Sequence, residues 1–279
     1  MGRIQRFASN SNRLVAFLIS IPIGILGGLI GLGGAEFRLP VLIGVLKRQA
    51  LEAVPINLAI SLITIITSLI MRAGVISSFP LMDLLPILLS MMSGGVLSAL
   101  TAANLASKIS KHALETWMKV LLIAIGLLLI LEGFLHFDSA DLINSHPFIQ
   151  IIVGLLAGIL IGIVSTSLGV AGGELIIPTL IFIFGVGIKV AGTASLIISL
   201  PTVCVGLMRY HHLGKSFDRT TASQIIVPMG AGSIIGSILG ALLYGIFSPN
   251  ILKVFLGAIL IYAAIKMFMR SNTRALSGS

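Results

Sequence analysis

The sequence has few charged residues. Asp, Glu, Lys and Arg make up 10% of its 279 residues, whereas a soluble domain carries about 25%. Hydrophobic residues make up 57% and the mean hydropathy is +1.13. A chain of this composition cannot present a water-facing surface on all sides. We therefore expect an all-α polytopic membrane protein, with the lipid bilayer as its main environment.

Cysteine is nearly absent as well. Cys204 is the single cysteine and lies in an apolar segment, so a disulfide framework and a Cys-based metal site within one chain are excluded. His211 and His212 are adjacent, but a metal site needs more ligands than these two provide. We expect no metal, no cofactor and no enzyme, because the apolar segments contain serines but no nucleophile–base set.

Positive charge exceeds negative charge, giving a formal net charge of +9. A basic chain can bind nucleic acid, but here Lys and Arg lie in short loops between apolar runs. Cytoplasmic loops of membrane proteins collect these residues. We therefore expect no nucleic-acid partner, and a homo-oligomer is left open.

The sequence repeats itself at an offset of 138 positions, without a gap for about fifty residues. The matched pairs are Gly24 and Gly162, Gly31 and Gly169, Gly34 and Gly172, Glu36 and Glu174, Pro40 and Pro178, Ser61 and Ser199, and Thr64 and Thr202. We predict a first transmembrane repeat at 1–135, an acidic linker at 136–146, a second repeat at 147–272 and a cytoplasmic tail at 273–279.

Each repeat contains one apolar run too long for a single spanning helix. Residues 14–46 would form a helix of about 50 Å, against a hydrocarbon core of about 30 Å. We predict a helical hairpin broken at glycines, followed by three transmembrane helices. The apolar segments lie near 14–30, 35–46, 53–73, 80–106 and 113–135, and near 147–168, 174–187, 190–209, 221–247 and 250–270.

The distribution of cations supports the hairpin. If 14–46 returns to its own side, most Lys and Arg lie in the cytoplasm, with Arg72, Lys189 and Lys253 outside and Arg38 in the core. The positive-inside rule favours this topology over a single crossing. It places both termini in the cytoplasm and makes the second repeat inverted, a plan found in many secondary transporters. Two short crossings in place of each hairpin would give ten spans instead of eight.

The stretch GLGGAEFRLP, residues 31–40, breaks the first apolar run. Its glycines permit a tight reversal, and a short helix that starts near Ala35 would point its free amides at the membrane centre, where they favour an anion. The second repeat supplies the same device. We predict that both breaks face one midplane cavity; the residues assigned to substrate binding in them are Gly31, Gly33, Gly34, Ala35, Glu36, Arg38, Gly172, Gly173 and Glu174.

Small polar residues follow each break at helical spacing. The two stripes are Asn57, Ser61, Thr64 and Ser68, and Ser195, Ser199, Thr202 and Gly206. The i, i+4, i+7, i+11 spacing places each stripe on one helix face. We assign Asn57, Ser61, Ser195 and Ser199 to the substrate-lining wall.

Other interpretations stay open at this point. Glycines, including Gly94, Gly95, Gly232 and Gly236, can simply let helices pack closely, and hydroxyls can bond to their own helix. Glu36 and Glu174 can complement a helix dipole, or mark a proton pathway. Arg38 faces either the substrate or Glu36.

Each half contains one related glycine motif, GLGGAEFRLPVL in the first and GVAGGELIIPTL in the second, and RYHHLG follows at 209–214. In these motifs the chain resembles the sulfite exporter TauE/SafE family. The resemblance implies a secondary transporter, expected to work as an exporter, of small sulfur-containing anions such as sulfite or organosulfonates across the inner or plasma membrane. Alternating access of the two repeats, with Glu36 or Glu174 carrying a proton, is the expected mechanism. A passive anion channel and a permease for a non-sulfur organic anion are the alternatives. The repeat partner of Arg38 is Ile176, so the first motif has a cation that the second lacks. This asymmetry leaves open an anion other than sulfite.

Overall fold

A computed structural model describes the backbone of residues 2–73, 81–105, 111–135, 146–168, 170–214 and 217–276. Side chains are described for 13–49, 52–73, 82–100, 120, 122–131, 133–134, 146–166, 170–214, 217–262 and 264–265. The predicted linker, apart from His146, the last three residues of the tail and Gly169 lie outside the described residues.

Every regular element in the described part of the chain is helical, as the sequence predicts. The helices are α1 Gly2–Ile30, α2 Ala35–Gly44, α3 Ala50–Arg72, α4 Leu81–Leu105, α5 Lys111–Leu135, α6 Pro147–Leu168, α7 Gly173–Phe182, α8 Ile188–His212, α9 Arg219–Thr221, α10 Val227–Ile246 and α11 Pro249–Leu276. A π-helical turn, Ala222–Ile226, joins α9 to α10.

The start of α9 is fixed by a side-chain cap. The Asp218 carboxylate accepts a hydrogen bond from the backbone amide of Thr221, at 2.9 Å. Hydrogen bonds from Thr221 hold the pKa of this exposed carboxyl below its usual value. The cap therefore starts the helical segment that leads through α9 and the π-helical turn into α10.

Six described helical stretches are long and apolar enough to cross a membrane. They are Arg13–Ile30, Glu52–Arg72, Met82–Leu100, Pro147–Thr166, Ile188–His212 and Arg219–Ile246. Shorter apolar stretches are Leu122–Leu131, Gly173–Phe182 and Pro249–Tyr262. The all-α polytopic membrane fold is confirmed.

Each predicted break divides its apolar run unequally. In the first run, α1 has a stretch long enough to span the bilayer, whereas α2 has 10 residues and is about 15 Å long. The second run gives α6 and the 10-residue α7 in the same proportions. Each hairpin therefore combines one long helix with a half-length one.

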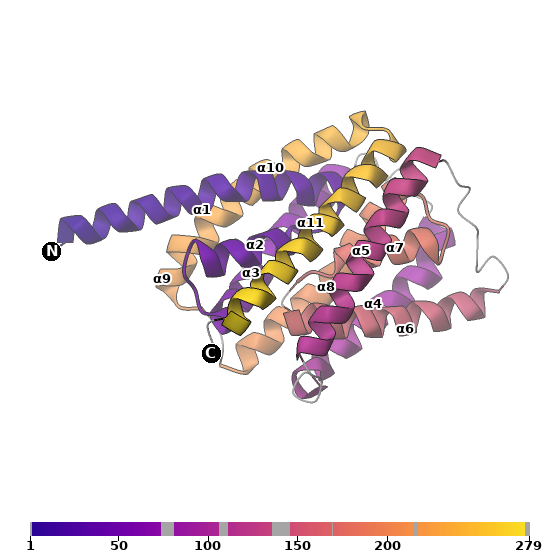
Figure 1. Cartoon of the computed structure of the whole chain (residues 1–279), viewed down its shortest axis with the longest axis horizontal. Helices are drawn as coiled ribbons and strands as arrows, with labels where there is room; N and C mark the ends of the chain where they lie inside the picture. Colours follow the sequence, from indigo (N-terminus) through magenta and orange to yellow (C-terminus); the bar gives the residue numbers. More distant parts are fainter. Residues whose placement is uncertain are drawn as a thin grey trace.

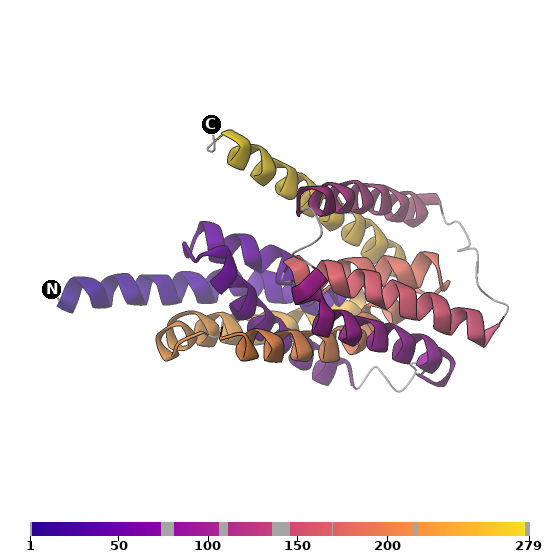
Figure 2. The same cartoon turned by 90° about the horizontal axis from the view of Figure 1, so that it is seen from below.

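The two hairpins run in opposite directions. In Figure 1, α1 runs from the N-terminus at the left towards the centre, and α6 runs from the right towards the centre; Figure 2 shows the same directions from below. The predicted inverted repeat requires this arrangement. Its orientation relative to a bilayer stays a prediction.

Helices of one half pack mainly on helices of the other half. The largest contact surfaces are those of α1 with α10, α4 with α6, and α5 with α11, and α3 packs on α8 at the centre. Under the offset of 138, α1 corresponds to α6 and α10 to α4, so the first two contacts are copies of each other. The halves are interlocked rather than placed side by side.

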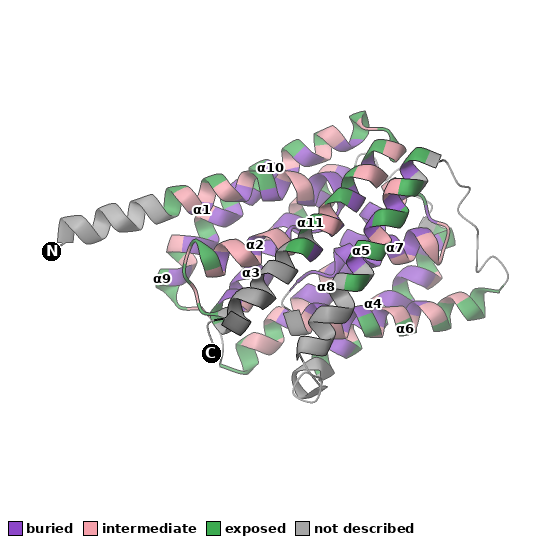
Figure 3. Ribbon diagram, viewed as in Figure 1, coloured by how far each residue is buried: buried purple, intermediate pink, exposed green. Residues whose placement is uncertain are grey.

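The core lies around the half-length helices, and the outer helices expose apolar side chains (Figure 3). Met82, Phe148 and Ile246 are 80%, 72% and 77% exposed. Leu32, Leu42 and Ile177 are fully buried at the centre. An apolar exterior around a buried centre containing polar groups suits a protein surrounded by lipid.

Glycines allow the α1–α10 and α4–α6 contacts to be close. A Cβ added to Gly236 of α10 would overlap the Ile21 carbonyl of α1, and one added to Gly94 of α4 would overlap the Leu155 carbonyl of α6. At Gly95 the added atom would meet the Thr202 side chain instead. The packing interpretation is therefore confirmed for these interfaces, as it is for Gly232 against Phe17.

We expect Gly236→Ala to destabilise the protein, because the added methyl group meets backbone and forces α1 away from α10. Overpacking of this kind costs roughly 1–3 kcal/mol. Gly245→Ala, also in α10, is the matched control because nothing lies within 4 Å of its added Cβ. Thermal melting in detergent measures both, and equal melting temperatures for the two variants would contradict the close contact.

Candidate functional site

The first break is a turn of glycines in the left-handed region. Gly31, Gly33 and Gly34 have φ values of 95°, 79° and 72°, which other residues rarely adopt. Gly31 also lies against backbone, because a Cβ there would overlap the Gly192 carbonyl of α8. The sequence therefore needs glycine at this turn for conformation and for space.

The second break lies directly against the first. Gly172 has a φ of 80°. A Cβ added to Gly33 would be 3.2 Å from the Cβ of Ala171, and one added to Gly173 would be 2.9 Å from the Cα of Leu32. The N-termini of α2 and α7 therefore meet at the centre, and the structure brings the two predicted glycine motifs into one cluster.

Arg38 lies fully buried in this cluster, in the second turn of α2. Its Nη1 donates to Ser61 Oγ at 3.0 Å, and its Nη2 donates to Thr64 Oγ1 at 3.0 Å. Nη2 also lies 3.4 Å from both the Gly33 carbonyl oxygen and Ser233 Oγ. The guanidinium is thus held by neutral oxygens from α3, α10 and the break itself.

Two carboxylates accompany the guanidinium. Neither oxygen of Glu36 is exposed or hydrogen-bonded to another described residue, so Arg38 and Glu36 interact through space without a direct hydrogen bond. Glu174, 5% exposed, interacts electrostatically with Glu36. The centre therefore combines one fixed cation with two carboxyl groups at the helix N-termini.

The predicted polar stripes face the breaks. All four residues of the first stripe are buried, as are Ser195, Ser199, Thr202 and Gly206 of the second. Asn57 Nδ2 donates to the Ala35 carbonyl at 2.9 Å, and Ser195 Oγ donates to the Gly31 carbonyl at 3.1 Å. These two side chains bond to the broken backbone, and the hypothesis that the stripes line a substrate path stays a prediction.

Arg72 was missed as a site residue, because its place at the end of an apolar run suggested an external loop. It is 1% exposed. Nη2 donates to the Gly28 and Leu29 carbonyls at 2.7 and 3.1 Å, and Nη1 donates to Thr193 Oγ1 at 3.0 Å. The guanidinium carbon lies 4.2 Å from the centre of the Tyr244 ring.

Arg72 therefore caps the C-terminal end of α1, where carbonyls have no partner in the helix. A sequence signal existed, because an arginine follows the polar stripe at the next position on its face: Ser68 and Arg72 are four residues apart. Its repeat partner at the same offset is Tyr210, so an arginine stands at this position in the first repeat only, as it does at position 38.

Metal ligands of the usual kind are not grouped in the described part of the chain. No three His, Cys, Asp or Glu side chains there could hold one ion. His211 and His212 lie at the end of α8, where they line a groove with Pro55, Leu207, Met208 and Phe217.

One family model matches nearly the whole chain. The model of the family described as sulfite exporter TauE/SafE matches residues 3–129 and 154–278. The first matched stretch lies within the first predicted repeat, and the second begins within the second predicted repeat and extends into the predicted tail. No curated protein and no solved structure matched the chain.

We expect Arg72→Met to lower the free energy of unfolding by roughly 2–4 kcal/mol, since it leaves two buried carbonyls without a donor. Arg13→Gln is the control, because Arg13 is exposed near the start of the described side chains. Melting temperatures in detergent compare the two. An unchanged melting temperature for Arg72→Met would show that the cap contributes little.

Proposed function

The chain belongs to the sulfite exporter TauE/SafE family, and we propose that it exports small sulfur-containing anions, such as sulfite or an organosulfonate, across the inner or plasma membrane. That it is a multi-pass membrane transporter rests on the family and on its spanning helices. The identity of the transported anion, the direction of transport and its coupling to protons are what we propose.

The observation that carries the proposal is a cation buried where two helix N-termini meet. Arg38 is the fourth residue of α2. Its amide bonds to the Gly34 carbonyl at 3.3 Å, so the amides before it have no partners within the helix. Such amides and an arginine both favour an oxyanion. Arg38 Nε has no hydrogen-bond partner among the described residues.

Binding of a sulfur anion requires the centre to open. The cavity at the second break has a volume of about 10 Å³, enough for one water-sized species but not for sulfite, which has four heavy atoms. The structure thus supports a closed conformation, and separation of the two repeats around the breaks would admit the anion. Such alternating access is typical of inverted-repeat transporters.

Proton coupling is part of the proposal because of Glu36 and Glu174. Two ionised carboxylates that interact with each other would repel an incoming anion. Protonation of one removes a negative charge from the centre, so proton and anion movement become linked.

We expect the protein in proteoliposomes to give saturable currents on rapid addition of a sulfur anion, and Arg38→Met to abolish them by removing the central cation. Solid-supported membrane recordings would compare sulfite, sulfoacetate, sulfate, thiosulfate and a carboxylate. Arg13→Gln is the matched control, with an exposed cation removed.

Two outcomes would contradict this proposal. Folded protein that responds to none of the sulfur anions would exclude this substrate class. Currents that scale with voltage and do not saturate would indicate a passive anion channel.

We expect Glu36→Gln to remove the dependence of transport on a pH gradient, because the amide keeps the shape of the side chain but does not ionise. Glu52→Gln, which changes an exposed carboxylate at the start of α3, should leave that dependence intact. Initial rates with and without a pH gradient measure the effect. Full coupling in Glu36→Gln would exclude Glu36 as the proton carrier.

A further inference from the structure

The hydroxyl groups that contact Arg38 differ in how their hydrogens are used. A hydroxyl can donate one hydrogen bond and accept two. Thr64 accepts from Arg38 and donates to the Ile60 carbonyl of its own helix at 2.9 Å. Ser61 and Ser233, both 0% exposed, also accept from Arg38, but neither donates to another described residue. Two buried O–H donors therefore lie beside the guanidinium without an acceptor.

The guanidinium itself contributes a third unused donor. Arg38 is 0% exposed, and its Nε has no hydrogen-bond partner among the described residues. The Glu36 oxygens are also unpartnered there, so they do not serve these donors in this conformation. Buried donors normally find acceptors, and leaving one unpaired is costly. Three such donors on contacting side chains point to a ligand with several acceptor oxygens.

The three donors come from different helices and from both repeats. Arg38 is on α2, Ser61 on α3 and Ser233 on α10. Ser233 thus brings a hydroxyl of the second repeat to a cation of the first, with Oγ 3.4 Å from the guanidinium Nη2. A ligand that accepts from all three side chains would bridge the two repeats.

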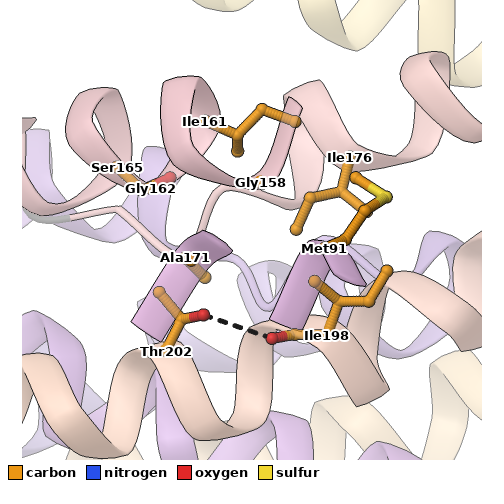
Figure 4. Close-up of a pocket in the computed structure, with 10 residues that line it drawn as sticks. Met91, Gly158, Ile161, Gly162, Ser165, Ala171, Ile176, Ile198 and Thr202 are labelled. Carbon is orange, nitrogen blue, oxygen red and sulfur yellow. Dashed lines mark hydrogen bonds between the residues drawn. The ribbon is translucent and has the colours of Figure 1, made fainter. Parts of the chain in front are cut away.

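The equivalent position in the second repeat does not offer this set of donors. At the offset of 138, the repeat partners of Arg38 and Ser233 are Ile176 and Gly95. Figure 4 shows the Ile176 side chain at the small cavity of the second break, whose lining is mostly apolar. The described part of the chain therefore presents the combination of guanidinium and free hydroxyls at the first break and not at the second.

The arrangement of donors favours one class of anion. A carboxylate has two oxygens, and the guanidinium fork can bond to both of them in one plane. Donors on two further helices could serve a carboxylate only where they share that plane. A sulfite or sulfonate group has three oxygens that do not lie in one plane with the sulfur, so it can accept from a guanidinium and from hydroxyls placed around it.

We propose that Ser61 and Ser233 determine the anion selectivity of this site, by donating hydrogen bonds to the oxygens of a sulfite or sulfonate group that Arg38 holds. The inference rests on the proposed function, because it concerns the same site and the same anions. It adds that a hydroxyl of the second repeat discriminates between anions, and that the bound anion links the two repeats.

The test compares the binding of sulfite, methanesulfonate and acetate. Methanesulfonate and acetate carry the same charge and the same methyl group, so they differ in the head group alone. Melting temperatures of the purified full-length protein in detergent are measured as each anion replaces chloride at constant ionic strength, and the concentration dependence of the shift gives the dissociation constant. We expect the sulfur anions to bind at least about tenfold more tightly than acetate. Acetate that binds as tightly as both sulfur anions would overturn the proposal.

Substitutions of the two serines assign the selectivity to their hydroxyls. Ser233→Ala should raise the dissociation constants of sulfite and methanesulfonate about tenfold or more, and leave that of acetate within about twofold. Ser237→Ala is the matched control, because Ser237 is equally buried one turn further along α10 and its hydroxyl already donates to the Ser233 carbonyl. Ser61→Ala should act as Ser233→Ala does, and it keeps the test decisive if Ser233→Ala does not fold.

The outcomes separate this inference from the proposed function. Unchanged affinities in both serine variants, an equal loss for all three anions, or the same loss in Ser237→Ala would refute the selective hydroxyls. Saturable sulfur-anion currents from wild-type protein together with any of these results would leave the proposed function standing. Selective binding that depends on Ser233, without sulfur-anion currents, would support the hydroxyls and contradict the proposed transport.

Discussion

The broken backbone at the centre of the protein exposes carbonyl groups that water cannot reach, and the arrangement around it depends on satisfying them. The Gly28 and Leu29 carbonyls accept from Arg72, that of Gly31 from Ser195, that of Gly33 from Arg38 and that of Ala35 from Asn57. These donors come from α2, α3 and α8. An unsatisfied group at membrane depth costs several kcal/mol, so the break requires the helices around it to be positioned to within a hydrogen-bond length.

The two repeats solve this problem differently. In the first, two guanidinium groups enter the core, one at the end of α1 and one beside the start of α2. In the second, their repeat partners are Tyr210 and Ile176. Ser199, the counterpart of Ser61, has an Oγ with no hydrogen-bond partner among the described residues, whereas Ser61 accepts from Arg38. The corresponding α1–α10 and α4–α6 contacts form despite these different side chains, so close helix packing is what the two repeats share.

Much of the fold follows from the sequence. The glycine breaks, the half-length helices and the polar stripes were predicted to within a few residues, because apolar run length and repeated glycine motifs report directly on local structure. Apolar run length did not predict the buried state of Arg72, although its position four residues after Ser68 on the polar stripe was a signal. Its burial depends on Tyr244 and Thr193, which are distant in sequence, and a cation at the end of an apolar run has the same local pattern whether it faces water or caps another helix.

The sequence predicted which residues belong to the site, and the structure brings them together. It did not predict the hydrogen bonds that these side chains make. Ser233 of α10 lies 3.4 Å from Arg38, although the two residues are 195 positions apart in the sequence. Side-chain hydrogen bonds between distant helices depend on the register of packing, which spacing along one helix does not specify. The distance between Glu36 and Glu174 also depends on the register of helix packing, so the sequence did not predict how strongly the two carboxyl groups interact.

The interlocked packing of the halves has a consequence for biosynthesis. The first helix, α1, makes its largest contact with α10, which is synthesised about two hundred residues later. In the folded protein, Gly24 and Gly28 of α1 pack against Ser233 and Ser237. This glycine face has no α10 to pack on until nearly the whole chain has been inserted. The early chain therefore presents a close-packing surface to lipid for most of its synthesis, and a protein truncated before α10 would leave that surface permanently uncovered.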